Sequence, residues 1–195
     1  MIQRRTNKAP RANANSRNRV RIVGGDWRSR VIQFPDAPGL RPTADRVRET
    51  LFNWLGQTLH GKRCLDLFAG SGALGFEALS RGAEQVVMVE NNRAAYAALE
   101  DNARLLDATH AALRYADAGA YLKGCRDAFD VIFLDPPFQA DVLAGILEML
   151  PAVLAPDGVV YLESGKPLLE AAPGWRVLKQ GKAGMVNFGL IEFGT

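Results

Sequence analysis

From residue 62 onward, segments with strand composition alternate with segments of helical composition, and this alternation allows only a few folds. Parallel strands need long crossover connections, which are usually helices, so the pattern predicts a parallel sheet with helices on both faces. The predicted strands are Cys64–Phe68, Gln85–Val89, Ala112–Tyr115, Phe129–Leu134 and Gly158–Leu162. The predicted helices cover residues 73–81, 92–106, 117–123 and 140–154. The expected fold class is therefore α/β and Rossmann-like.

The carboxyl-terminal part of the chain departs from this alternation. Trp175–Leu178 and Met185–Phe193 both have strand composition, and the segment between them holds the turn residues of 181–184. Strands joined by so short a connection pair antiparallel. A carboxyl-terminal hairpin at the sheet edge is therefore predicted, and it brings the expected sheet to seven strands.

The first residues of the chain differ from the rest in composition and charge. Residues 1–19 are rich in Arg and Asn and contain almost no large apolar side chains, so they are predicted to be a disordered basic tail. The first fifty residues hold 12 basic and 4 acidic side chains, whereas the remainder holds 12 and 17. A basic arm on an acidic body is typical of nucleic-acid binders, although a solvated tail without function gives the same pattern. Residues 20–195 are expected to form one domain.

A small hairpin is expected at the start of that domain, as an extension over residues 20–40. The apolar segments Arg21–Val23 and Val31–Phe34 flank a glycine-containing turn, which predicts two antiparallel strands with Arg28 and Arg30 at the tip. These arginines, together with Arg46 and Arg48, are candidates for RNA phosphate contacts. The alternative for each of them is an ordinary solvated charge.

The next segment, Gly39–Thr43, leads into a predicted helix. Pro42 fixes the approach of the chain, and Thr43 is a good N-cap residue for a helix with an apolar face. Val47, Leu51 and Trp54 recur on that face at helical spacing.

Several classes of protein are excluded by composition. The only two cysteines, Cys64 and Cys125, lack the paired spacing of a metal site or a disulfide framework, which favours a reducing cytoplasm and no metal. Leu143–Ala155 is the longest apolar segment, but it is too short to span a bilayer and is interrupted by Glu148 and Pro151. A cytoplasmic monomer without a membrane segment is the expectation.

A glycine-rich turn follows the first predicted strand. Gly70 and Gly72 suit a tight turn close to a ligand, and Gly75 lets the following helix pack against the sheet. Sites for NAD, FAD and S-adenosylmethionine share this pattern, and a purely structural turn gives it too. The loop alone therefore indicates an adenosine-containing cofactor without identifying it.

Acidic residues at strand ends narrow the choice. Glu90 lies 20 residues after Gly70, where an acid receives the ribose hydroxyls of an adenosine cofactor. Asp66 ends the first strand, where an acid suits a cofactor with an amino-acid ammonium group. Phe68, two residues later, is a further candidate for cofactor contact. Asp117 is placed to accept from an adenine amino group, although it also suits a helix cap. The set favours S-adenosylmethionine.

The sharpest motif is Asp135-Pro136-Pro137-Phe138, which follows the fourth strand. Two prolines stiffen the turn and leave the Asp135 carboxylate and the Pro136 carbonyl as fixed acceptors. An exocyclic NH2 group has two donors, so this pair can orient its nitrogen toward a methyl sulfonium. Phe138 offers an apolar face on which an extruded base can stack. The catalytic candidates are therefore Asp135, Pro136 and Phe138.

Together these motifs resemble the class I amino-methyltransferases. Three longer blocks, 21–28, 41–55 and 68–83, are similar to the RsmD family of bacterial 16S ribosomal RNA guanine-N2 methyltransferases, and the resemblance covers residues 20 to about 193. It implies the seven-stranded fold, S-adenosylmethionine as cofactor and 16S RNA, within an assembling small subunit, as partner. It also implies that Arg41, Thr43 and Glu49 line the cofactor and base pocket. The basic tail lies outside the pattern.

Other functions fit parts of this sequence. An adenine-N6 or cytosine-N4 methyltransferase carries the same Asp-Pro-Pro-Phe loop, but the chain is too short for a separate DNA-recognition domain. A non-catalytic nucleic-acid-binding protein with the same fold, or an NAD-dependent oxidoreductase, would explain the glycine turn. The acids Asp66 and Asp135 argue against both.

Overall fold

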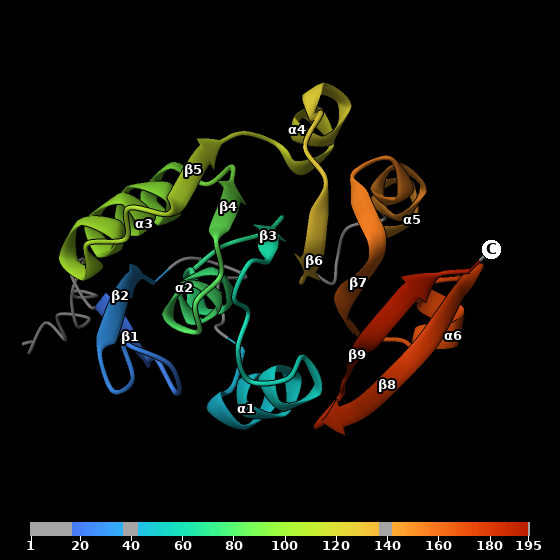
Figure 1. Ribbon diagram of the computed structural model, residues 1–195, viewed down its shortest axis with the longest axis horizontal. Helices are drawn as coiled ribbons and strands as arrows, with labels where there is room; N and C mark the ends of the chain where they lie inside the picture. Colours follow the sequence, from blue (N-terminus) through green and yellow to red (C-terminus); the bar gives the residue numbers. More distant parts are fainter. Residues whose placement is uncertain (1–16, 37–42, 137–141, 195) are drawn as a thin grey trace, which may run out of the picture.

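The computed structural model describes residues 17–36, 43–136 and 142–194. Its centre is a seven-stranded sheet with the strand order β5-β4-β3-β6-β7-β9-β8, shown edge to edge in Figure 1. The strands are β3 (Arg63–Asp66), β4 (Gln85–Glu90), β5 (Ala111–Tyr115), β6 (Phe129–Leu134), β7 (Leu154–Ser164), β8 (Trp175–Ala183) and β9 (Val186–Phe193). The first five strands are parallel and β9 runs antiparallel between β7 and β8, so the predicted fold class and edge hairpin are confirmed.

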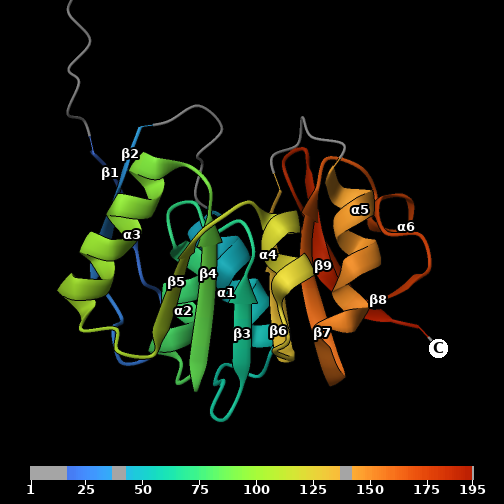
Figure 2. The same ribbon diagram turned by 90° about the horizontal axis from the view of Figure 1, so that it is seen from above.

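Helices cover both faces of the sheet, as Figures 1 and 2 show. The elements are α1 (Asp45–Trp54), α2 (Ala73–Ser80), α3 (Arg93–Leu106), α4 (Ala118–Gly124), α5 (Val142–Met149), the 3-10 turn η1 (Leu150–Ala152) and α6 (Leu168–Ala171). Buried side chains of α1, α2 and α3 pack on one face, and those of α4, α5 and α6 pack on the other. The helix predicted over 140–154 is shorter in the structure. Helix α5 ends at Met149, the 3-10 turn η1 follows it, and β7 begins at Leu154.

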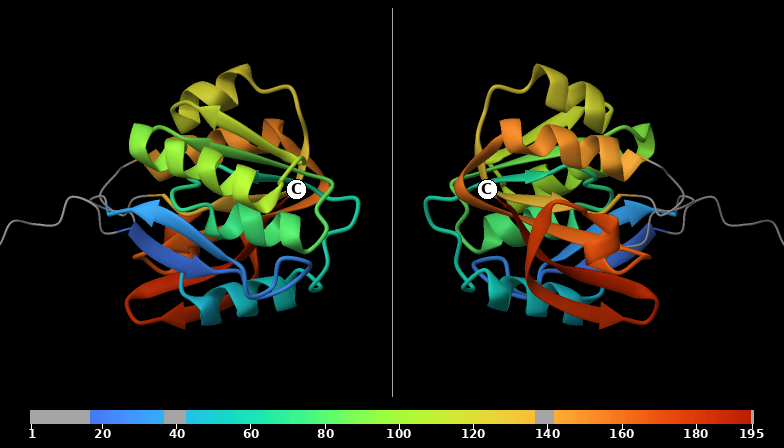
Figure 3. Two further views of the ribbon diagram at one scale, coloured as in Figure 1. Left: turned by 90° about the vertical axis from the view of Figure 1, so that its left-hand side faces the viewer. Right: turned by 90° about the vertical axis from the view of Figure 1, so that its right-hand side faces the viewer.

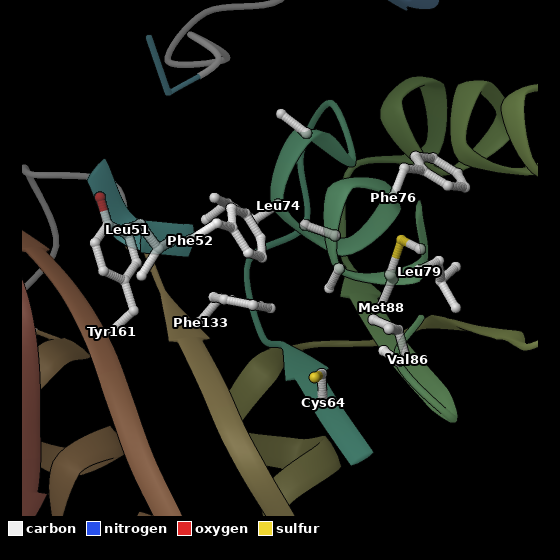
Figure 4. Packing of buried hydrophobic residues seen from close by; sticks show 14 of the residues in the cluster. Leu51, Phe52, Cys64, Leu74, Phe76, Leu79, Val86, Met88, Phe133 and Tyr161 are labelled. Carbon is white, nitrogen blue, oxygen red and sulfur yellow. The ribbon is translucent and has the colours of Figure 1, made fainter. Parts of the chain in front are cut away.

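Strand alternation divides the core between these two layers. On β3, Cys64 faces the layer of α1 and α2, whereas Leu65 faces the layer of α4 and α5. Figure 4 shows the first layer, in which Phe133 of β6 and Tyr161 of β7 lie beside Phe52 of α1. Since successive side chains of a strand point to opposite faces, a central strand with helices on both sides must be apolar throughout.

A separate two-stranded sheet consists of β1 (Arg17–Arg21) and β2 (Val31–Pro35). The hairpin was predicted, but β1 begins at Arg17, inside the segment expected to be disordered; residues 1–16 lie outside the described residues. Figure 3 shows the hairpin on the side of the molecule that carries α1 and α2. Ile22 and Ile32 are buried in the shared core, so the hairpin is packed against the domain.

Candidate active site

Four strands end at one edge of the sheet with an acidic side chain. The parallel register places Asp66, Glu90, Asp135 and Glu163 at or just beyond the carboxyl ends of β3, β4, β6 and β7. In open α/β sheets, ligands bind at this edge. The first three acids were predicted from the sequence and Glu163 was not.

Asp66 is buried behind the glycine turn. Its Oδ2 accepts a hydrogen bond of 3.0 Å from the backbone N–H of Gly75, and its exposed fraction is only 3%. Burial raises the pKa of the Asp66 carboxyl from 3.8 to about 7, and the nearby charge of Glu90 adds to the rise. The side chain thus supports the first turn of α2, and it forms no ion pair with a described residue.

The glycine turn has the backbone conformation that its sequence predicts. Gly70 and Gly72 have φ angles of 52° and 79°, which favour glycine. A Cβ on Gly75 would lie 2.7 Å from the sulfur of Met88 on β4, so this glycine does permit close packing of helix and strand. Glu90 holds the turn in place, because its Oε2 accepts from Gly70 N–H at 2.8 Å while Oε1 accepts from Asn92 N–H at 2.6 Å.

Asp117 and Phe68 are two further predicted cofactor residues, and the structure describes both. Asp117 is exposed and caps α4, accepting from Ala120 N–H at 3.0 Å. Phe68 is half-buried and packs against the layer of α4 and α5. The helix-cap interpretation of Asp117 is confirmed, and one oxygen of its carboxylate makes that contact.

Asp135 and Glu163 stand next to each other on neighbouring strands. Leu134 of β6 pairs with Leu162 of β7, so the two acids that follow these residues occupy adjacent positions. Burial raises the pKa of the Asp135 carboxyl well above its usual value, and the charges of Glu163 and Asp66 raise it further. Burial raises the pKa of Glu163 too. Two adjacent carboxylates in a dry site repel each other and favour a donor or a cation between them.

Glu163 is held by two hydroxyl groups. Thr43 Oγ1 donates to Glu163 Oε1 at 3.0 Å, and Tyr161 OH donates to the same oxygen at 2.8 Å. Both hydrogen bonds oppose the rise of the Glu163 pKa because they favour the ionised form. The prediction that Thr43 caps α1 is wrong. The N-cap residue is Ala44, which makes no side-chain cap, because the Thr43 hydroxyl is directed to Glu163.

The acids at this edge fit a cationic ligand. None of Asp66, Asp135 and Glu163 forms an ion pair with a described residue. Across the described ranges, no cluster of three or more His, Cys, Asp and Glu side chains could hold a metal ion. A ligand with a sulfonium and an ammonium group would offset the repulsion that raises these pKa values.

Some predicted site residues cannot be placed. Arg41, Pro137 and Phe138 lie outside the described residues. Pro136 is described and buried directly after Asp135. Glu49, which the family resemblance placed in the pocket, instead lines a cavity of about 530 Å³ together with His60 and Arg81 at the amino-terminal edge of the sheet.

The candidate phosphate contacts separate into two kinds. Arg28, Arg30 and Arg46 are exposed, and Arg30 also donates to the carbonyl oxygen of Leu105. Arg48 is fully buried and pairs with Glu77 and Asp45. The interpretation of Arg48 as a phosphate contact is therefore wrong.

Glu163 could have been found in the sequence. It ends an apolar strand, Gly158–Leu162, in the same way that Asp135 ends Phe129–Leu134. The rule that selected Asp66 and Asp135, an acid at the carboxyl end of a parallel strand, applies to it equally. The acid lacks a distinctive following motif, and only the register shows that it neighbours Asp135.

Comparison with known sequences gives consistent matches. Residues 20–192 match the model of a family described as conserved hypothetical protein 95. The chain is 40% identical over 186 residues to ribosomal RNA small subunit methyltransferase D of Escherichia coli, covering 92% of this chain and 93% of the relative. The protein of the same name from Haemophilus influenzae is 38% identical, covering 91% and 96%.

Comparison with solved structures supports the same grouping. A methyltransferase structure from Escherichia coli superposes with a TM-score of 0.78 at 39% identity, covering 89% of this chain and 97% of that one. A methylase from Haemophilus influenzae gives a TM-score of 0.74 at 38% identity, covering 90% and 99%.

Proposed function

The chain belongs to the RsmD family of ribosomal RNA small subunit methyltransferases, described as conserved hypothetical protein 95, and on this premise we propose that it methylates the exocyclic N2 amine of a guanine in 16S ribosomal RNA. It is an S-adenosylmethionine-dependent methyltransferase. The observation that carries the proposed reaction is the group of acids at the carboxyl ends of β3, β6 and β7, of which Asp66 and Glu163 are buried and Asp135 is partly buried. These acids suit a cationic methyl donor and a base that offers N–H groups.

We assign the cofactor to the glycine turn and its neighbours. Asp66 receives the ammonium group, Glu90 the ribose hydroxyls and Asp117 the adenine amine. Gly70 and Gly72 let the backbone approach the ligand, and Phe68, Arg41 and Thr43 complete the walls. Bound here, S-adenosylmethionine supplies a methyl group activated by its positively charged sulfur.

Asp135 and the Pro136 carbonyl orient the guanine amine in this proposal. The two hydrogens of the amine point to these acceptors, so the nitrogen lone pair faces the methyl carbon. As the N–C bond forms, the C–S bond breaks and its electron pair stays on sulfur. The nitrogen becomes positive and loses a proton, and the Asp135 carboxylate stabilises that charge before the proton passes to solvent. Phe138 stacks on the extruded base.

The partner in this proposal is the ribosomal RNA of an assembling small subunit, met in the cytoplasm by a monomeric enzyme that uses no metal. No helix within the described ranges has both the length and the apolar character needed to cross a membrane. Exposed Arg28 and Arg46 are available for phosphate contacts.

The test is transfer of label from S-adenosylmethionine to free small-subunit RNA and to subunits from cells lacking the enzyme, followed by nucleoside analysis. We expect N2-methylguanosine. Labelled adenosine or cytidine would move the reaction to another amine, and absence of label on any RNA would contradict the proposal.

Asp135→Asn separates chemistry from binding in the same assay. The variant keeps the size of the side chain and removes its charge, so we expect at least a hundredfold loss of transfer with cofactor affinity within a few fold. Asp101→Asn on the exposed face of α3 is the matched control. Full activity of Asp135→Asn would refute the role of this carboxylate.

A further inference from the structure

Glu163 lies in the candidate site, and neither the glycine turn nor the Asp-Pro-Pro-Phe loop includes it. Its side chain is 7% exposed and adjoins Asp135 across the pairing of β6 and β7. Neighbouring strands are about 4.8 Å apart, so two carboxyl groups at their ends can each receive one of two adjacent N–H groups. Burying a carboxylate costs free energy unless its oxygens receive hydrogen bonds or a cation, so the partners of each oxygen matter.

The two oxygens of Glu163 have different environments. Oε1 accepts from both Thr43 Oγ1 and Tyr161 OH, at 3.0 and 2.8 Å. Oε2 makes no hydrogen bond to a residue that the structure describes. The two hydroxyls therefore fix the carboxyl group by one oxygen and leave the other available to a ligand.

The bases with exocyclic amines differ at the ring nitrogen next to the amine. Guanine has a donor there, N1–H, beside its N2 amine. Adenine and cytosine have a lone pair at the corresponding ring nitrogen. A carboxylate oxygen facing that nitrogen accepts from guanine and repels the other two bases, because an unmet or opposed buried polar group is costly.

We propose that Glu163 is a specificity-determining residue whose Oε2 accepts the N1–H of the target guanine while Asp135 binds the neighbouring N2 amine. This inference rests on the proposed function and deepens it, since it names the feature that selects guanine. Thr43 and Tyr161 act as positioning residues for this carboxylate.

The test replaces the target guanine by 2-aminopurine in an otherwise identical RNA. This analogue keeps the amine at C2, but it has a lone pair at N1 in place of N1–H and a hydrogen at C6 in place of O6. The group that faces Glu163 therefore changes from donor to acceptor, and the Glu163 variant separates this change from the loss of O6. We expect the wild-type enzyme to prefer guanine by at least a hundredfold in kcat/KM.

Glu163→Gln should reverse much of that preference. Thr43 and Tyr161 both donate, so the amide oxygen of Gln takes the place of Oε1 and the amide NH2 takes the place of Oε2. A donor then faces N1, which suits 2-aminopurine and opposes guanine. We expect kcat/KM for guanine to fall at least tenfold and the preference for guanine to shrink to less than about tenfold.

Controls distinguish this proposal from a structural role and from the proposed function. Asp135→Asn should lower transfer to both bases alike, and the melting temperature of Glu163→Gln should stay within a few degrees of wild type. An unchanged preference in Glu163→Gln, an equal loss on both bases, or a wild-type preference for 2-aminopurine would overturn the role of Glu163. Absence of N2-methylguanosine with the wild-type enzyme would instead overturn the proposed function.

Discussion

The hydroxyl of Thr43 makes a different contact from the one that its position before a helix predicts. A threonine directly before a helix usually accepts from the helix N–H groups, but this hydroxyl donates to Glu163. Helix α1 begins without a side-chain cap as a result. Helix α1 therefore lacks the stabilisation of about 1 kcal/mol that a side-chain cap would give. The Thr43 hydroxyl instead fixes the carboxyl group of Glu163.

Asp66 leads to a pH-dependent prediction. An aspartate in an unfolded chain has a pKa of about 3.9, and the folded value is raised to about 7. A raised pKa means that the cofactor-free protein loses stability as the pH rises from about 4 to 7. Asp66→Asn removes this loss, so the free energy of unfolding of the variant relative to wild type should rise by about 2.5 kcal/mol between pH 5 and pH 8.

Urea unfolding at the two pH values measures this effect, with Asp101→Asn as the control. Titration calorimetry on the same variant should show at least tenfold weaker binding of S-adenosylmethionine, since the ammonium group loses its carboxylate partner. A pH-independent difference in stability would show that Asp66 is ionised in the free protein.

At the scale of elements, the hairpin β1–β2 is attached to α2 by buried polar groups. Glu77 Oε2 accepts from Val23 N–H at 2.8 Å and from Arg48 Nη1 at 3.3 Å, and Oε1 accepts from Arg81 Nε at 2.8 Å. Ser80 adds a hydrogen bond from its hydroxyl to Gly24 O at 2.6 Å. Helix α2 thus carries the glycine turn at its start and the hairpin along its length.

Removing Glu77 should therefore be costly. Glu77→Ala leaves the buried guanidinium of Arg48 without this partner, so we expect a loss of about 3–5 kcal/mol in the free energy of unfolding, measured in urea. Glu100→Ala, on an exposed position of α3, is the matched control and should change stability by less than about 0.5 kcal/mol. A loss for Glu77→Ala no larger than that of the control would contradict the anchoring role.

At the scale of the whole molecule, charge and packing are distributed differently along the chain. The two core layers lie between β1 and β9, whereas residues 2–16 hold four basic side chains and no acidic one. Such a segment can contribute to RNA affinity through counterion release without contributing to the core.

Deletion of residues 2–16 tests this separation. We expect weaker RNA binding and a slope of log affinity against log salt that is smaller by up to about 3, since each phosphate contact to single-stranded RNA contributes about 0.7. The urea midpoint should not change. Binding by filter retention at several salt concentrations measures the slope, and an unchanged slope would show that the tail makes no phosphate contact.

The local sequence was enough to predict the strand and helix order, the glycine turn and three of the acids at the strand ends. Alternating strand and helix composition predicted the sheet, because parallel strands require crossover helices. Glycine at positions 70 and 72 permits the positive φ angles that the turn adopts. Asp66, Glu90 and Asp135 could be selected because the end of a parallel strand is where such a sheet binds ligands.

Only the tertiary structure decided which polar side chains share a site. The pairing of β6 with β7 brings Asp135 beside Glu163, 28 positions later in the chain, and the path before α1 directs Thr43 to the same carboxyl group. Arginine side chains are usually exposed, but Arg48 is buried because it forms an ion pair with Glu77 of α2. Periodicity predicts the face on which a side chain lies, whereas its partner depends on strand register and helix packing.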